Sequence, residues 1–199
     1  MKFTETKLKG AYVIELEKLT DERGYFARAW CKEEFLKHGL DADLVQCNVS
    51  YNPRTGTLRG MHYQDPPYAE TKLVRCTRGA VYDVIVDLRP SSPTFLQWTA
   101  AELTPENGRM MYVPKGFGHG FQSLEPDSMV FYQVSEFYAR DYCRGVRWND
   151  PALTISWPLE VSVISHQDGG WKDLDTHRLE PLRQFLNNPE SHTLLKIGE

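Results

Sequence analysis

The sequence predicts a mainly β domain, an antiparallel sandwich or barrel with short helices at its periphery. From residue 44 to residue 138 strand signals dominate, and the segments are short. Gly, Pro, Asn, Asp or Ser separates them at frequent intervals, which is typical of an all-β sandwich or barrel. The chain contains neither GxGxxG nor GxxxxGK[ST], which excludes Rossmann and P-loop folds. Its 199 residues fit a single domain over 1–199.

The first elements alternate between strand and helix signals. Residues 11–18 (AYVIELEK) have the pattern of a strand, and residues 20–26 (TDERGYF) form a polar turn that leads into an extended aromatic segment. Residues 31–40 (CKEEFLKHGL) have the charge pattern of a helix with Gly39 as its C-cap. The later strands are expected in LVQCNVSYN, TLRGMHYQ, KLVRCT, AVYDVIVDL, FLQWTAAEL, RMMYVP, FQSLE and SMVFYQVSEFY.

The C-terminal stretch, residues 172–199, is polar. Terminal segments of this composition are often poorly tied to the domain. We therefore expect a polar surface appendage here, with one short helix in THRLEPLRQFLNN.

Bulk properties exclude several classes of function. The net charge is −4, which disfavours a protein that binds nucleic acid in a groove. No apolar run approaches the ~20 residues that a membrane span needs, and MKFTETKLKG has no signal-peptide core. The four cysteines form no CxxC or zinc-site spacing, so we expect free thiols and a cytoplasmic location.

Strand alternation indicates which side chains share a face. In TKLVRCT, Lys72 lies on the face of Val74 and Cys76, and in SMVFYQVSE, Tyr132 lies between two valines. A lysine on an apolar face costs free energy unless it is paired or lines a wet pocket. Lys72 is therefore expected to line a pocket, the alternative being a lysine that extends to solvent at a rim.

Arg59 and His62 are three residues apart, so a regular strand points them to opposite faces. Gly60 lies between them and is a place where a β-bulge can redirect one side chain. Both residues reach one site only if such a bulge forms.

Two spaced motifs resemble those of the cupins, small antiparallel β-barrels of the jelly-roll type with a site inside. In the usual metal-binding pattern the ligands are three histidines and a glutamate, but Gln64 and Lys72 occupy two of these positions here. A protonated lysine has no lone pair for a metal, and His62 and His119 alone are too few ligands. No metal or other cofactor is therefore expected. The motif positions are Gly56, His62, Gln64, Lys72 and Gly79, followed by Gly108, Pro114, Gly116, His119 and Ser123.

A narrower resemblance is to the dTDP-4-dehydrorhamnose 3,5-epimerase family. It rests on GTLRGMHYQ, KLVRCTRGAVYDVIVDLRPSSPTF, YVPKGFGHGFQSL and RGVRWNDPALTISWP, together with DERGYF near the start. The resemblance implies an isomerase of deoxysugar biosynthesis that inverts carbons beside the ketone of a nucleotide-diphosphate-linked 4-keto-6-deoxyhexose. It also implies that no metal or cofactor is used and that the protein is a homodimer whose subunits share strands.

The resemblance also implies the residues that remove the proton. His62 is the candidate base, because histidine titrates near neutral pH. In the family an aspartate near the C-terminal end of the barrel pairs with this histidine, and here that residue is Asp168 in ISHQDGGW. A carboxylate on the second ring nitrogen fixes the tautomer and stabilises the imidazolium. Asp83 is the alternative partner.

Other residues match the groups that handle the enolate and return the proton. Lys72 and Arg59 are expected to stabilise the enolate oxygen. Inversion needs a proton donor on the opposite face, and Tyr132 matches the family's tyrosine acid. His119 is either a substrate contact or a hydrogen-bonded histidine of the core.

For the nucleotide, the resemblance implies that Arg23 in DERGYF contacts the diphosphate, for which guanidinium groups are well suited. Phe26 and Tyr138 are expected to sandwich the base, and Gln46 and Asn48 to hydrogen-bond its edge.

The chain departs from the family pattern at two points. Arg28 stands where the family commonly has glutamate, and CNVS follows Gln46 where the family has DNHS. Arg28 reverses a charge near the expected base or sugar site. A nucleotide other than thymidine, or a differently substituted sugar, therefore stays open.

Two alternatives to an epimerase remain at this point. A ketoisomerase of the same fold uses the same enolate but returns the proton to oxygen or to another carbon. A non-catalytic nucleotide-sugar-binding protein needs no acid or base, so the joint presence of His62, Asp168, Tyr132 and Lys72 argues against it.

Overall fold

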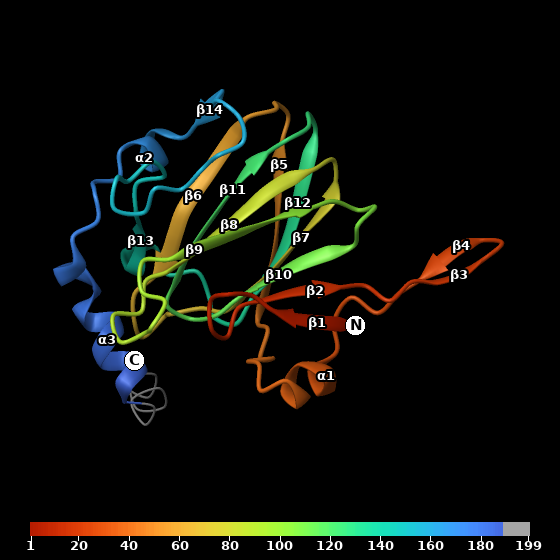
Figure 1. Cartoon of the computed structure of the whole chain (residues 1–199), viewed down its shortest axis with the longest axis horizontal. Helices are drawn as coiled ribbons and strands as arrows, with labels where there is room; N and C mark the ends of the chain where they lie inside the picture. Colours follow the sequence, from red (N-terminus) through yellow and green to blue (C-terminus); the bar gives the residue numbers. More distant parts are fainter. Residues whose placement is uncertain (189–199) are drawn as a thin grey trace.

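In the computed structural model, which describes residues 1–188, two antiparallel sheets pack face to face as in a jelly roll (Figure 1). The mainly β fold with short peripheral helices is as predicted. The first sheet has the order β1 (Lys2–Glu5), β2 (Tyr12–Glu15), β10 (Arg109–Val113), β7 (Lys72–Arg78), β12 (Ser128–Val134) and β5 (Gln46–Asn52). The second has the order β13 (Cys143–Gly145), β6 (Thr57–Gln64), β11 (Phe117–Ser123), β8 (Val81–Asp87) and β9 (Trp98–Leu103).

The remaining elements lie around these sheets. The short strand β14 (Val163–Ile164) pairs in parallel with β6. The strands β3 (Leu19–Asp21) and β4 (Gly24–Phe26) form a separate hairpin. The helical segments are α1 (Lys32–Lys37), η1 (Arg140–Tyr142), α2 (His166–Gly169), η2 (Thr176–Leu179) and α3 (Glu180–Asn187). None of the helices within residues 1–188 is long and apolar enough to cross a membrane. All four cysteines are free, as predicted.

The main core lies between the two sheets. Its side chains come from β7, β10 and β12 of the first sheet and from β8, β9 and β11 of the second, with Val74, Met111, Ile85 and Phe121 among them. The alternation within β7 sends Val74 and Cys76 into this core, as the sequence predicts.

Each sheet is also covered on its outer face. Helix α1 inserts Phe35 against Ile14, Leu73 and Tyr112 of the first sheet. The strand β8 is buried almost throughout, because its second face meets the C-terminal segment of the chain. Because both faces of β8 are covered, its sequence is a nearly continuous apolar run.

The C-terminal segment requires a correction to the expected appendage. The predicted helix is present as η2 and α3, but Leu179, Leu182 and Phe185 are buried against Val84 and Leu88 of the second sheet's outer face. The segment's polar average hides an apolar side that packs on the domain. The last part of the expected appendage, 189–199, lies outside the described residues.

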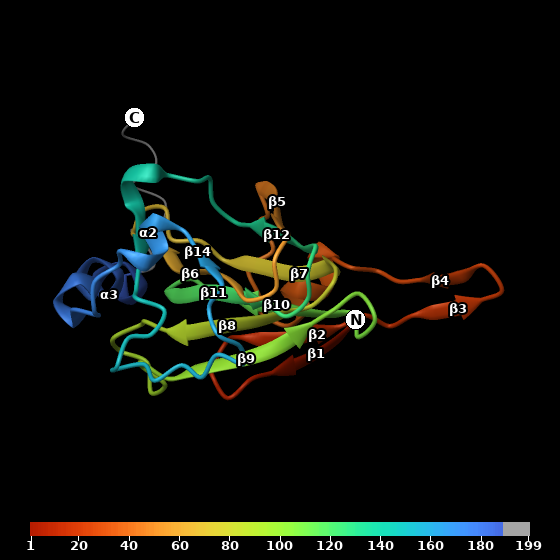
Figure 2. The ribbon, with the colours of Figure 1, turned by 90° about the horizontal axis from the view of Figure 1, so that it is seen from above.

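The β3–β4 hairpin projects away from both sheets, and Figures 1 and 2 show it extended on the side opposite α3. Its apolar side chains Leu19 and Phe26 are 69% and 71% exposed. We refer to residues 19–26 as the arm. Exposed apolar side chains on a projecting hairpin indicate a surface that takes part in an interaction.

Candidate active site

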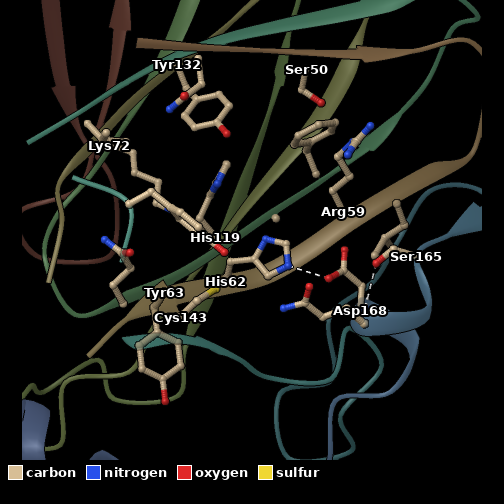
Figure 3. A pocket seen from close by; sticks show the side chains of 18 of the residues that line it. Ser50, Arg59, His62, Tyr63, Lys72, His119, Tyr132, Cys143, Ser165 and Asp168 are labelled. Atoms are coloured by element: carbon tan, nitrogen blue, oxygen red, sulfur yellow. Dashed lines mark hydrogen bonds and ion pairs between the residues drawn. The ribbon is translucent and has the colours of Figure 1, made fainter. Parts of the chain in front are cut away.

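A cavity of about 830 Å³ opens between the sheets, within the size range of small-molecule sites. Figure 3 shows side chains from both sheets and from α2 pointing into it. Most of the predicted site residues line this cavity, although they come from widely separated parts of the chain. Those residues are Gln46, Asn48, Arg59, His62, Lys72, His119, Tyr132, Tyr138 and Asp168.

His62 and Asp168 form the shortest polar pair in the cavity. His62 Nε2 lies 2.6 Å from Asp168 Oδ1 (Figure 3). Since an ionised carboxylate only accepts hydrogen bonds, Nε2 carries the proton and Nδ1 is left as the acceptor. No described residue bonds to Nδ1, and the ring is one-third exposed (34%), so this nitrogen is accessible to a substrate.

Helix α2 holds Asp168 in place. The Asp168 backbone N–H donates to the Oγ of Ser165, the N-cap of the helix, at 3.0 Å. Oδ2 accepts from the Gly60 backbone N–H at 3.2 Å. Burial favours the neutral acid, but the His62 contact and the Gly60 and Ser165 hydrogen bonds outweigh it and lower the pKa of Asp168. Asp168 is therefore a fixed anion at neutral pH.

An irregularity in β6 brings Arg59 and His62 to the same cavity. Against β11, His62 pairs with His119 and Arg59 pairs with Phe121, so the register shifts between them. Gly60 has a φ of +126°, and a side chain there would meet the backbone of Gly120 at 2.5 Å. The expected bulge is thus present, and only glycine fits at its centre.

Lys72 lines the cavity and is paired, in agreement with the expectation for a buried lysine. Its Nζ lies 3.0 Å from Glu70 Oε1, and its side chain is only 9% exposed. Gln64, which occupies a metal-ligand position of the cupin motif, holds the surrounding loops instead. Its amide nitrogen donates to the backbone oxygens of Tyr68 and Phe137, and its oxygen accepts from the Ala139 N–H.

Tyr132 belongs to β12 of the first sheet and faces His62 of the second across the cavity (Figure 3). Its neighbours Val130 and Val134 are buried, as the alternation predicts. The tyrosine and the histidine–aspartate pair therefore approach a bound molecule from opposite sides.

A second histidine–aspartate pair lies deeper in the cavity. His119 Nε2 is 2.8 Å from Asp83 Oδ2, and Asp83 is fully buried. Of the two carboxylates considered for His62, Asp168 is thus the one in contact, while Asp83 holds His119. Both histidines line the cavity from neighbouring strands.

Three predicted nucleotide contacts lie outside this cavity. Arg23 is on the arm, 82% exposed, and pairs with Asp21. Phe26 is on the same arm. Arg28 pairs with Glu34 at the start of α1, at 2.8 Å. The expectation that these residues join the site is not met within one chain, because the arm carries Arg23 and Phe26 away from the sheets.

Other predicted contacts form a group at the cavity. Gln46 Nε2 donates to Asn48 Oδ1 at 3.0 Å, and the backbone N–H of Tyr138 donates to Gln46 Oε1 at 3.4 Å. Sequence reasoning missed several further lining residues, Glu70, Cys143 and Gln167 among them. An acidic residue two positions before a buried lysine was the available signal for Glu70, whereas nothing in the sequence marked Cys143. Burial raises the pKa of the Cys143 thiol, which keeps it neutral.

The donor set of the cavity does not suit a metal ion. No group of three or more His, Cys, Asp or Glu side chains among residues 1–188 is arranged to hold one. His62 and His119 each have a carboxylate on one nitrogen, and the ammonium group of Lys72 lies in the same cavity. The residues are therefore suited to proton transfer and to binding of an oxyanion.

Comparison with known proteins places these features in one family. Residues 5–176 match the sequence profile of dTDP-4-dehydrorhamnose 3,5-epimerase. The protein of that name from Sinorhizobium fredii is 42% identical over 175 residues, which cover 87% of this chain and 90% of the relative.

Two solved structures extend the likeness to the fold. The crystal structure of the Bacillus anthracis dTDP-4-dehydrorhamnose 3,5-epimerase with TDP and PPi bound has a TM-score of 0.84 and 43% identity, covering 87% of this chain and 99% of that one. A 3′-monoepimerase from Streptomyces bikiniensis in complex with dTDP-quinovose has a TM-score of 0.82 and 30% identity, covering 95% and 98%.

Proposed function

The chain belongs to the dTDP-4-dehydrorhamnose 3,5-epimerase family, an isomerase family, and we propose that it inverts C3, C5 or both in a dTDP-linked 4-keto-6-deoxyhexose without metal or cofactor. The observation that carries the proposal is the arrangement of His62 with Asp168 on one side of the cavity and Tyr132 on the other. An epimerase needs a base and an acid on opposite faces of the reacting carbon.

In the first step His62 Nδ1 removes a proton from the carbon beside the ketone. Its Nε2–H remains bonded to Asp168, so the imidazolium that forms is stabilised by the carboxylate 2.6 Å away. The lowered pKa of Asp168 supports this role, because an ionised partner is needed throughout the reaction.

The enolate oxygen that develops in this step is stabilised by cations. Lys72 is the leading candidate, because its ammonium is buried in the cavity and compensated by Glu70 before substrate arrives. Arg59 adds a second positive charge at the rim, where its Nε donates to Asn52 Oδ1 at 2.8 Å. The pair Lys72–Glu70 is overall neutral, so the buried lysine is not an unpaired charge when the cavity is empty.

In the second step Tyr132 donates a proton to the opposite face of the carbon, and the configuration inverts. A ketoisomerase does not need this second donor. The position of Tyr132 on the sheet opposite His62 therefore favours epimerisation over the isomerase alternative.

The nucleotide end is formed by Gln46, Asn48 and Tyr138 together with a second copy of the chain. Arg23 and Phe26 stay far from their own cavity on an exposed arm, and a homodimer allows them to reach the cavity of the partner. Arg23 then contacts the diphosphate and Phe26 faces the base opposite Tyr138. A cytoplasmic location accompanies this proposal, since nucleotide sugars and free thiols are typical of that compartment.

The test is a panel of nucleotide-linked 4-keto-6-deoxyhexoses incubated with the protein in D2O and followed by NMR. Deuterium is expected at C3, C5 or both, together with inverted product, and the dTDP-linked compound is expected to react fastest. Exchange without inversion, or no exchange with any member of the panel, would contradict an epimerase. A preference for another nucleotide would assign base selection to Arg28 and the CNVS segment instead.

A further inference from the structure

A second cavity lies on the outer side of β6 and β13, behind the site described above. Its volume is about 640 Å³, within the range of small-molecule pockets. The strand β13 forms the partition, since Gly145 is the cross-strand partner of His62 and Arg144 is the partner of Tyr63. In Figures 1 and 2 this region, next to α2 and α3, is on the side opposite the arm.

The lining of the second cavity is strongly basic. It includes Arg144, Lys172, Arg178 and His177, and no carboxylate of residues 1–188 lines it. A small cavity with several cations and no lining anion has a positive potential that favours a bound anion.

Most of these cations keep donors available. Lys172 and the His177 ring have no partner among the described residues, and the Arg178–Asp175 pair is long, at 3.9 Å. Arg144 is held in place, with Nε on Asp65 at 2.7 Å and Nη1 on the Asp141 carbonyl at 2.8 Å. Its Nη2 has no partner among the described residues. A guanidinium fixed in this way is preorganised for an oxyanion.

Two aromatic residues, Tyr63 and Trp171, also line this cavity. Trp171 Nε1 is buried and has no hydrogen-bond partner within residues 1–188, which is uncommon for an indole. The Trp171 ring packs so closely over Gly145 that a β-carbon there would lie 2.1 Å from it. The Tyr63 side chain is also buried, and its hydroxyl bonds to none of the described residues.

We propose that this second cavity binds a phosphorylated small molecule, with Arg144, Lys172 and Arg178 holding the phosphate, Tyr63 donating from the buried side and Trp171 forming part of the wall. The volume exceeds what an inorganic ion fills, so an organic phosphate of sugar-phosphate size fits best. None of the second cavity's cations lines the first cavity, although Tyr63 lines both.

The test is titration of the full-length protein with inorganic phosphate and, separately, with glucose 1-phosphate, followed by calorimetry and tryptophan fluorescence. Saturable binding is expected, with a fluorescence change that disappears in Trp171→Phe. The double variant Lys172→Ala/Arg178→Ala is expected to bind about tenfold or more weakly, because charge-assisted hydrogen bonds are lost. Its epimerase activity and melting temperature are expected to stay at the parental values.

Two control variants separate this site from other causes. Lys37→Ala/Arg109→Ala removes the same charge from α1 and β10, outside both cavities, and is expected to bind as the parent does. Arg59→Ala removes a cation of the first cavity. Loss of binding in Arg59→Ala with retention in Lys172→Ala/Arg178→Ala would overturn the proposal, as would the absence of saturable binding of both probes. Tighter binding of glucose 1-phosphate identifies an organic phosphate as the occupant, and equal binding identifies inorganic phosphate.

Discussion

Asp168→Asn tests the proposed base directly, because it changes one atom of the contact with His62. In the parent, Oδ1 accepts from His62 Nε2 at 2.6 Å and Oδ2 accepts from the Gly60 N–H at 3.2 Å. An asparagine has only one accepting oxygen. If that oxygen stays on Gly60, the amide nitrogen faces Nε2 and favours the tautomer with the proton on Nδ1. That tautomer cannot accept a proton from the substrate.

The size of the effect follows from two contributions. A charge-assisted hydrogen bond to the imidazolium contributes about 1.5–3 kcal/mol, which corresponds to roughly 10–100-fold in rate. The wrong tautomer adds to this, and in a comparable Ser-His-Asp arrangement the same substitution lowers kcat by roughly 10⁴-fold. A fall in kcat between about 10² and 10⁴ is therefore expected for Asp168→Asn. His62→Asn, which removes the base itself, is expected to lose at least as much.

The assay is deuterium incorporation from D2O into the 4-keto sugar, measured beside inversion. Asp168→Asn should slow both together, since the aspartate acts before the enolate forms. The matched control is Asp83→Asn, which changes the carboxylate bonded to His119 and leaves the His62 contact intact. Parental exchange in Asp168→Asn would refute the reasoning, and a larger loss in Asp83→Asn would transfer the base to His119.

Four further outcomes are expected. Tyr132→Phe should retain deuterium exchange while inverted product falls sharply, with a stability loss of about 1 kcal/mol for one hydroxyl; inversion at the parental rate would make Tyr132 a core residue. Elemental analysis should find no stoichiometric transition metal, and chelators should leave activity intact; metal-dependent activity would contradict this. If each arm completes the cavity of the partner subunit, refolding the Arg23→Ala and His62→Ala variants together should form mixed dimers with one intact cavity and restore up to about a quarter of the parental active sites. No recovery of activity would mean that Arg23 serves the cavity of its own chain or none. Leu182→Ala should cost about 2–5 kcal/mol by urea unfolding with catalysis unchanged, whereas a change under 0.5 kcal/mol would mark a surface appendage.

The sequence predicted those parts of the fold that follow from simple alternation. The face shared by Lys72, Val74 and Cys76 and the inward position of Tyr132 follow from a period of two, and the structure agrees. A lysine on an apolar face also predicts a pocket, because burying its charge without a partner costs free energy. Its partner Glu70 lies just outside the strand, where its spacing of two residues from Lys72 was the available signal.

Average polarity misled the interpretation of the C-terminal segment. Leu179, Leu182 and Phe185 recur at three-residue intervals, which places them on one side of a helical stretch. This pattern was available in the sequence and indicated a packed helix. The arm shows a different limit: DERGYF carries the family's nucleotide residues, but no local pattern states that a hairpin extends beyond its own domain.

Arg59 and His62 illustrate how the site depends on an irregularity that residue types alone do not determine. A regular β6 would leave one of them on the outer face, and the enolate would lose either its base or a cation. The register shift against β11 removes this conflict, and it needs two glycines in contact, since a Gly60 side chain would meet Gly120 backbone at 2.5 Å. The same Gly60 N–H also holds Asp168. The bulge therefore orients the aspartate as well as the two cavity residues, so the position of Gly60 links strand geometry to the ionised state of Asp168.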